Sequence, residues 1–381
     1  MKRLNPFILA ASIIFVLSSV LLTSCSKEDP EPEPLPDLAF IGDETCKTCH
    51  DANYTDYMKS GHPYKINKVT NNQSPIFPYA PTTVPLPEGT SAWNQISYVI
   101  GGYGWKARYI GLDGNVITGP NTQFNVMTGS MSNYSQSNPS YNCGQCHNTG
   151  WVTFADGGKR QDNMPGMDGA WFQPGVRCEA CHGMGNQHSI SKEKQHITID
   201  RTYDQCNVCH KRNKTDDKII TATSTSGTTF TMHRSTGDEL KANGHKNLEK
   251  GCVTCHDPHI GVLHGNAAMG GIQKNCSACH TDPKLKDFTH YDAKCNDCHM
   301  PNILKNATNK NKYIADERSH LFKIQMDTTS SQYTADNKHS NGFITLAYSC
   351  YQCHKDVDGI GGDKSKKSLT ALLNKAKTFH K

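Results

Sequence analysis

The chain has 381 residues, a formal net charge of +5 and a hydrophobic content of 35%, and it contains 17 cysteines, 31 glycines and 18 prolines. This low apolar content excludes a protein with several membrane spans and leaves little material for ordinary side-chain cores. The small positive charge is no evidence for nucleic-acid binding, and the sequence predicts no nucleic-acid partner.

The N-terminus has the pattern of a secretory signal. Basic residues at Lys2 and Arg3 precede an apolar run over residues 7–22, which leads into Thr23, Ser24 and Cys25. Small residues before a cysteine favour lipoprotein processing, so we expect residues 1–24 to be a signal peptide and Cys25 to carry the lipid. The alternative is a transmembrane anchor, but the run is shorter than the roughly 20 residues that a span needs. Residues 25–39 are rich in proline and glutamate and predict an extended linker.

Sixteen of the seventeen cysteines belong to eight copies of Cys-x-x-Cys-His. The motif cysteines are Cys46, Cys49, Cys143, Cys146, Cys178, Cys181, Cys206, Cys209, Cys252, Cys255, Cys276, Cys279, Cys295, Cys298, Cys350 and Cys353. The motif histidines are His50, His147, His182, His210, His256, His280, His299 and His354. In this signature of c-type haem, the thiols bond one porphyrin and the histidine is the proximal iron ligand. The sequence therefore predicts eight covalently bound haem c groups.

Structural zinc and redox disulfides also use paired cysteines. Neither needs a histidine after every pair, and with only 19 histidines in the chain such placement by chance is negligible. Haem attachment also changes the charge, because each oxidised haem adds about −1 through its propionates and iron. Many lysines and arginines are therefore expected to neutralise propionates.

Motif spacing divides the mature chain into a first-haem region, residues 40–142, and a seven-haem region, residues 143–381. Apolar runs flank Asp113-Gly114 and predict a small β-hairpin between the first and second motifs. Long periodic helices are few, although residues 364–381 have helical spacing of leucines. We expect a haem-cored fold that is mainly α, with much irregular chain.

The sixth coordination position of each iron decides between an electron carrier and an enzyme, because an iron capped by two histidines has no open position. Eleven histidines lie outside the motifs, and two of them, His196 and His264, each closely follow a better-placed candidate. The remaining candidates for distal ligands are His62, His188, His233, His245, His259, His290, His320, His339 and His380. Nine candidates are enough for eight irons, which favours electron transfer.

Several segments resemble the cytochrome c-554-type family of multihaem c-type cytochromes. They are the first motif with Ser60-Gly61-His62, residues 175–188, residues 252–259, residues 295–301, and Arg318-Ser319-His320. The resemblance implies distal roles for His62, His188, His259 and His320, and it supports His245 and His290. The family includes electron carriers and octahaem enzymes similar to hydroxylamine oxidoreductase and tetrathionate reductase. This chain departs from the variant that has lysine in place of a motif histidine.

The haem motifs and the supply of histidines are consistent with two main functions. The first is a lipid-anchored octahaem cytochrome that transfers electrons along bis-histidine haems. The alternative is an octahaem oxidoreductase that converts a small nitrogen or sulfur compound at one open or lysine-capped haem. Its candidate residues are Lys106, which could cap an iron, and Arg108, which could hold an anion. The simpler interpretation of these two residues is an ordinary strand with solvated charges.

Haem attachment and lipidation place the protein outside the cytoplasmic membrane, on the periplasmic side or at the cell surface, with the lipid expected in the outer membrane. The predicted partners are redox proteins or a quinol-linked membrane complex, with the membrane itself contacted through the N-terminal lipid. A homo-oligomer or a larger cytochrome assembly is a third possibility.

Overall fold

The computed structural model describes residues 34–213, 219–282, 290 and 292–380. The chain divides into two compact units, Met1–Asp37 and Leu38–Lys381. The expected signal peptide and Cys25 lie outside the described residues. Within the described ranges, no helix has both the length and the apolar character needed to cross a bilayer.

A five-stranded antiparallel sheet occupies the region between the first and second motifs. Its strands pair in chain order: β1 (Ile66–Lys68), β2 (Ile96–Gly101), β3 (Lys106–Gly111), β4 (Gly119–Asn125) and β5 (Ser130–Tyr134). Asp113-Gly114 forms the turn after β3, with Gly114 at φ +84°, and Ile110 then bridges to Val116.

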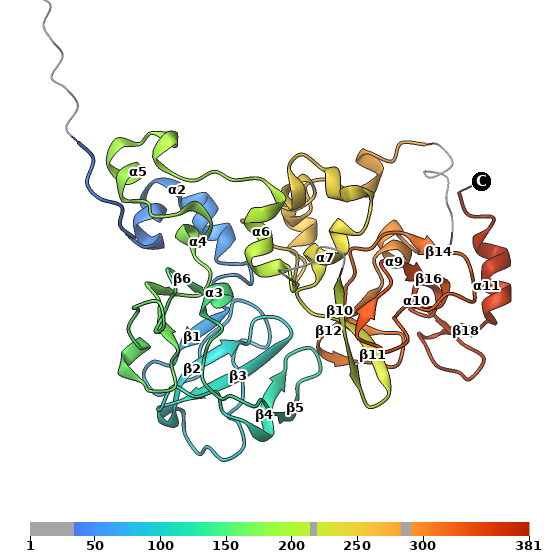
Figure 1. The fold of residues 1–381 in the computed structure, drawn as a ribbon, viewed down its shortest axis with the longest axis horizontal. Coiled ribbons are helices and arrows are strands. Elements are labelled where there is room, and N and C mark those ends of the chain that lie inside the picture. The colour runs from blue at the N-terminus through green and yellow to red at the C-terminus, as the bar shows by residue number, and fades with distance from the viewer. Residues whose placement is uncertain (1–33, 214–218, 283–289, 291, 381) are drawn as a thin grey trace, which may run out of the picture. The chain divides into compact units, whose positions relative to one another are not determined.

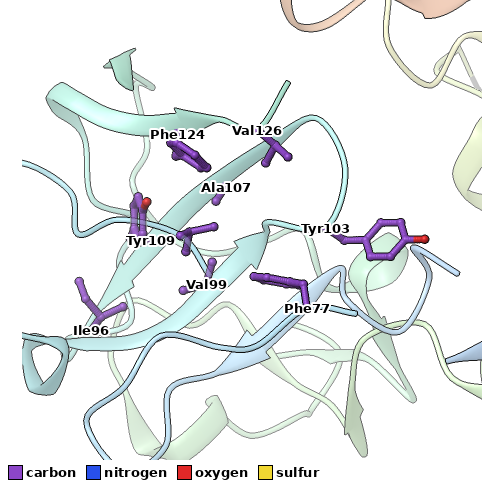
Figure 2. Close-up of a cluster of buried hydrophobic side chains, with 9 residues drawn as sticks. Phe77, Ile96, Val99, Tyr103, Ala107, Tyr109, Phe124 and Val126 are labelled. Carbon is purple, nitrogen blue, oxygen red and sulfur yellow. The ribbon is translucent and has the colours of Figure 1, made fainter. Parts of the chain in front are cut away.

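Both faces of this sheet are buried. Alternate residues of β2 and β3 point to opposite sides, so that Val99 pairs with Tyr109 while Tyr98 pairs with Ile110. Val99 and Tyr109 belong to one apolar cluster, which also holds Phe124 (Figure 2), and Tyr98 and Ile110 belong to a second cluster. The sheet is therefore a rigid support, with a core made of side chains rather than of haem.

A second sheet joins segments that are far apart in sequence. Its strands are β10 (Ile220–Thr225), β11 (Thr228–Met232), β12 (Asn302–Asn309), β13 (Ala315–Arg318) and β15 (His339–Ser340), in the order β13-β12-β11-β10-β15. The pairing of β11 with β12 is parallel. Ile303 and Leu304 of β12 are fully buried, and with Ile220 of β10 and Leu321 they belong to one apolar cluster.

Helices of 3 to 15 residues carry the motifs. They are α2 (Asp43–Tyr57), α3 (Gly144–His147), α4 (Cys178–His182), α6 (Tyr203–His210), η5 (Gly251–Thr254), η7 (Cys276–Ala278), α9 (Cys295–His299) and α10 (Leu346–Cys350). The other helices of at least six residues are α5 (Asn186–Ser191), α7 (Thr236–Lys241) and α11 (Leu369–Ala376) among the described residues. In the view of Figure 1, α6 lies above the two sheets. The helix expected within residues 364–381 is confirmed for Leu369–Ala376, where α11 buries Leu372, whereas Lys364–Lys366 form the strand β18.

The expected mainly α fold is wrong. The chain is 26% helical and 24% strand, and both five-stranded sheets are built from antiparallel pairs apart from β11–β12. Four two-stranded sheets add β6 (Asn148–Thr149) with β9 (Gln173–Pro174), β7 (Val152–Thr153) with β8 (Gly169–Ala170), β14 (Ile324–Gln325) with β16 (Ile344–Thr345), and β17 (His354–Lys355) with β18 (Lys364–Lys366). These strands are too short to show a period in sequence, so tertiary pairing decides them.

Candidate haem centres and an open coordination site

One continuous cavity of about 3310 Å³ runs through the Leu38–Lys381 unit, and it is lined by fifteen of the sixteen motif cysteines and seven of the eight motif histidines. None of the sixteen motif cysteines, all of which lie in the described part of the chain, forms a disulfide that would compete with haem attachment. Among the described residues, no three histidine, cysteine or acidic side chains converge as they would in a zinc site. The cavity therefore fits large flat cofactors better than isolated metal ions.

Seven motif histidines each face a second histidine that lies outside the motifs. The ring centres lie 6.3 Å apart in His50–His188 and His182–His259. They lie 6.1 Å apart in His62–His210, His245–His280, His256–His320, His290–His354 and His299–His380. Two metal–nitrogen bonds of about 2.0 Å separate the coordinating nitrogens by about 4 Å. The distances from nitrogen to ring centre supply the rest, so this spacing fits one iron between each pair.

Hydrogen bonds orient several of these rings. Nδ1 of His182 lies 2.8 Å from the Thr198 carbonyl, and Nδ1 of His299 lies 2.7 Å from the Phe322 carbonyl. His188 is held in the same way by the Glu193 carbonyl at 3.0 Å. An imidazole that donates from Nδ1 presents Nε2 as the free metal-binding nitrogen. These three rings are thus oriented for ligation through Nε2.

His147 of the second motif is the exception. Its Nδ1 lies 3.1 Å from the Lys65 carbonyl, so the ring is oriented as in the other motifs. Across the described part of the chain, however, no other histidine ring faces it at this spacing. Two expected distal ligands also have no motif histidine opposite them: His233 follows β11 and lines the cavity, and His339 lies in β15.

The motifs adjoin one another in an order that differs from the sequence. The thiols of Cys46 and Cys178 contact each other, as do those of Cys206 and Cys252, and of Cys276 and Cys295. Electrostatic contacts connect Cys181 with Cys206, Cys255 with Cys279, and Cys298 with Cys353. The resulting order is first, third, fourth, fifth, sixth, seventh and eighth motif. The second motif lies beside the fourth, because the Cys146 thiol is 3.9 Å from the Val208 carbonyl.

Cationic side chains line the cavity near His147, among them Lys65, Lys106, Arg108 and Arg234. The guanidinium of Arg234 contacts the Cys146 sulfur at 3.7 Å. Arg108 is held above the ring of Tyr134 at 3.5 Å, and its Nε donates to Gln123 at 2.9 Å. These contacts fix positive charge beside the motif, where a small anion can be bound.

The second sheet completes this site. Lys106 at the start of β3 donates to the backbone carbonyl of Asn306 in β12, and the Asn306 side chain donates to Glu317 in β13 at 3.3 Å. Trp105 donates to the Asp316 carbonyl at 2.9 Å. Lys106 and Glu317 are therefore brought together from positions more than 200 residues apart by two sheets that meet at the cavity.

Proteins of similar sequence also bind several haems. A family profile described as "Cytochrome c554 and c-prime" matches residues 119–183, which include the second and third motifs. The chain is 26% identical over 156 residues to the multihaem cytochrome MtrA of Shewanella baltica (strain OS185), covering 36% of this chain and 39% of MtrA. This chain is a multihaem cytochrome.

Other relatives share the fold of this cytochrome. It is 23% identical over 234 residues to the dissimilatory sulfite reductase MccA of Wolinella succinogenes, covering 46% of this chain and 32% of MccA. The solved structure of that octahaem sulfite reductase superimposes with a TM-score of 0.56 at 16% identity, covering 90% of this chain and 67% of MccA. The outer cell wall cytochrome OcwA superimposes with a TM-score of 0.54 at 18% identity, covering 89% of this chain and 86% of OcwA. The sequence matches to MtrA and MccA span well under half of either relative.

Two groups near His147 have pKa values near neutrality. Burial, together with the positive charge of the nearby Arg108, lowers the pKa of Lys106 to about 7. Burial raises the pKa of Glu317 to about 7, against the opposing effects of Asn306, Lys65 and Lys106. Burial also lowers the pKa of Lys65. The site therefore contains an amine and a carboxyl that both exchange protons around pH 7.

The sequence expectations named only part of this site. Lys106 and Arg108 were candidates for a substrate site only under the enzymatic alternative, and the preferred interpretation was a strand with solvated charges; the structure places both near His147. Lys65, Arg234 and Glu317 were not expected, because no motif marks them. The local order of histidines is also misleading: His188 follows the third motif but faces His50 of the first, and His259 follows the fifth but faces His182 of the third.

Proposed function

We propose that this protein is an octahaem oxidoreductase that reduces a small oxyanion at the second motif, using electrons delivered along the other haems. The observation that carries the proposal is the difference in distal surroundings: seven motif histidines face a histidine, whereas His147 faces a cavity lined by cations. Bound haems supply one-electron carriers and, at the second motif, an iron position that a substrate can reach. This is the enzymatic alternative considered above, rather than a carrier with every iron capped.

The residues around His147 fit the needs of such a reaction. Arg108 and Arg234 supply the charge to hold an anion, and the Tyr134 ring and Gln123 keep Arg108 in place. Each oxygen that leaves an oxyanion as water requires a pair of protons together with a pair of electrons. Lys106 and Glu317 are suited to supply these protons, because a general acid works best when its pKa is close to the working pH.

The spatial order of the motifs supports electron delivery to this site. The fourth motif contacts the third, the fifth and the second through its cysteines and their neighbours. Electrons that enter at either end of the row thus reach the fourth haem and pass to the second. A row of haems with two ends and a branch to the second motif suits an enzyme that receives electrons from a partner.

The resemblance in fold to the Wolinella sulfite reductase makes sulfite the first substrate to test, with nitrite as the comparison. We further propose eight thioether-bound haems, distal ligation by the seven paired histidines, and a lipid on Cys25 that anchors the protein outside the cytoplasmic membrane. Redox proteins or a quinol-linked complex would supply the electrons. The match to an outer cell wall cytochrome is compatible with a location outside the cell membrane.

Ligand binding tests the proposal directly. The full holoprotein, matured in a host that attaches haem c, is titrated with cyanide, nitrite and sulfite while its absorption spectrum is recorded. We expect one ligand per chain and turnover of at least one oxyanion with reduced viologen. Absence of binding by all three ligands would show that the second haem is closed, and the electron-carrier function would then be favoured.

A further inference from the structure

The segment around the eighth motif carries an exposed basic strip. β17 and β18 pair in parallel, with His354 opposite Lys364 and Lys355 opposite Lys366. Lys364, Lys366 and Lys367 are all exposed. Two apolar side chains lie exposed in the loop between the strands, Val357 at 66% and Ile360 at 36%. We call these five residues, Val357, Ile360, Lys364, Lys366 and Lys367, the lysine strip.

The acidic residues near the strip do little to cancel its charge. Asp356 is buried and forms an ion pair with Lys312 at 2.9 Å, which helps to lower the pKa of its carboxyl to about 2. Asp363 is 91% exposed and pairs with Lys310 at 3.2 Å. Each of these aspartates has a lysine partner outside the strip, and with the exposed Asp358 of the same loop counted against the three strip lysines, the strip keeps a net positive charge.

The strip is attached to the eighth motif through its backbone rather than through its lysine side chains. The amide of Lys364 donates to the Cys353 carbonyl at 2.8 Å, and Nδ1 of His354 lies 3.3 Å from the Ser365 carbonyl. All three lysines are exposed on a segment that lies directly on the motif, and Nζ of Lys366 also donates to the Val357 carbonyl at 3.5 Å. Because the charge of Lys364 also acts on the Cys353 thiol, a test of the strip needs a second reductant that reports on the haem itself.

The other end of the row of motifs lacks such a basic strip. In α2, which carries the first motif, Asp43 is buried and pairs with Arg177 at 3.0 Å, and Asp56 pairs with Lys59 at 3.0 Å, so that Glu44 and Asp51 are left against the single lysine Lys47. The first and eighth motifs are the two ends of the order of contacts described above. The two ends would therefore attract different redox proteins.

We propose that the lysine strip is the docking site for an acidic electron-carrier protein, which reduces the eighth haem. An apolar centre with a charged rim is the usual arrangement of a protein interface, and electron-transfer complexes are small, so a strip of this size is sufficient. Complementary charge raises the association rate without requiring tight binding. In the transfer step the carrier loses one electron and the iron at the eighth motif gains it. This inference rests on the proposed function for the direction of electron flow.

Stopped-flow reduction of the intact holoprotein tests the proposal, with reduced flavodoxin as the acidic probe and a zwitterionic viologen as an uncharged one. For the native protein we expect the second-order rate with flavodoxin to fall as salt is added. The triple variant K364E/K366E/K367E should react about tenfold more slowly or worse, with the salt dependence reversed. Its rate with the viologen should stay unchanged, which shows that the haems are intact.

The matched control carries three exposed lysines changed elsewhere, K159E/K192E/K338E, and should react with flavodoxin within about twofold of the native rate. Equal slowing of both triple variants would overturn the proposal, because only the net charge would then matter. An unchanged flavodoxin rate in the strip variant would also overturn it, as would strip-dependent binding to anionic vesicles or self-association instead. Haem reduction is measured here without substrate, so the outcome is independent of whether the second motif is catalytic.

Discussion

The second and fourth motifs are neighbours with the same local sequence pattern, yet their histidines have different surroundings. The Cys146 thiol of the second lies 3.9 Å from the Val208 carbonyl, and the Cys209 thiol of the fourth lies 3.8 Å from the Gln145 carbonyl. His210 faces His62, whereas His147 faces a cavity with lysine and arginine side chains. Function therefore depends less on the motif than on what the adjacent chain places opposite it. At the second motif, two β-sheets supply cations and a carboxyl; His233 lies among these cations, but among the described residues no histidine ring faces His147 at the spacing of the seven pairs.

The largest effect is expected from removing the cation beside the second motif. Arg108→Ala should lower kcat/KM for the reduced oxyanion by about 100-fold or more, because a fixed charge facing the anion is lost. Steady-state kinetics with reduced viologen measure this. The control is Arg160→Ala, since Arg160 also stacks on an aromatic ring, Phe154 at 4.2 Å, and should have little effect. Equal losses in both variants would contradict the assignment.

A smaller effect with a distinct pH signature is expected for Glu317→Gln. The pKa of Glu317 is raised to about 7, so its proton is available below pH 7 and lost above it; Lys106, with its pKa lowered to about 7, loses its proton in the same range. The native kcat/KM should therefore fall as pH rises through 7, approaching a two-proton slope. The variant should be about 100-fold slower with a one-proton slope. An unchanged slope would remove Glu317 from the mechanism, and Glu249→Gln, an exposed carboxyl, is the control.

Removing the facing histidine from one of the seven pairs should give that motif a ligand-accessible iron, like the one proposed at the second motif. In His188→Ala, the first motif loses the ring that faces His50, and a carbon monoxide titration of the reduced protein should then rise from one to two ligands per chain. His196→Ala should remain at one, because Nδ1 of His196 bonds the Ser191 hydroxyl at 2.7 Å and its ring faces no motif histidine among the described residues. A titration that stays at one ligand in His188→Ala would show that the facing ring is not a ligand.

The smallest effect concerns the contact between the sheets. Trp105→Phe removes the hydrogen bond to the Asp316 carbonyl and should lower the free energy of unfolding by about 1 kcal/mol. Denaturant unfolding of the holoprotein measures this loss. Trp93→Phe is the control, because Trp93 packs against Tyr109 by its ring alone. A similar loss in both variants would indicate ring packing rather than the hydrogen bond.

The haem motifs could be predicted from the sequence, but most of the fold could not. The Cys-x-x-Cys-His motif is local, so its eight copies and their histidines could be read directly. Strands of two to four residues, and a parallel pairing between Thr231 and Leu304, depend on contacts over long sequence distances. The apolar residues around Asp113-Gly114 indicated a hairpin, but not the five-stranded sheet with two buried faces.

The distal side of each motif could not be assigned from sequence. Nine candidate histidines exceeded the eight irons, so counting favoured complete capping. The structure instead places His339 in β15 and His233 after β11, and neither faces a motif histidine in the described residues. Which ring faces which motif is decided by the packing of helical turns that are distant in sequence. Lys106 and Arg108 were recognised as candidates, while Glu317 depends on the contact between two sheets.

The central claim is that one iron differs from the other seven, and low-temperature electron paramagnetic resonance of the oxidised full-length holoprotein tests it most directly. Seven low-spin signals and one high-spin signal that shifts on adding nitrite or cyanide are expected, in line with the seven histidine pairs. Eight low-spin signals that are indifferent to added ligand would contradict the account.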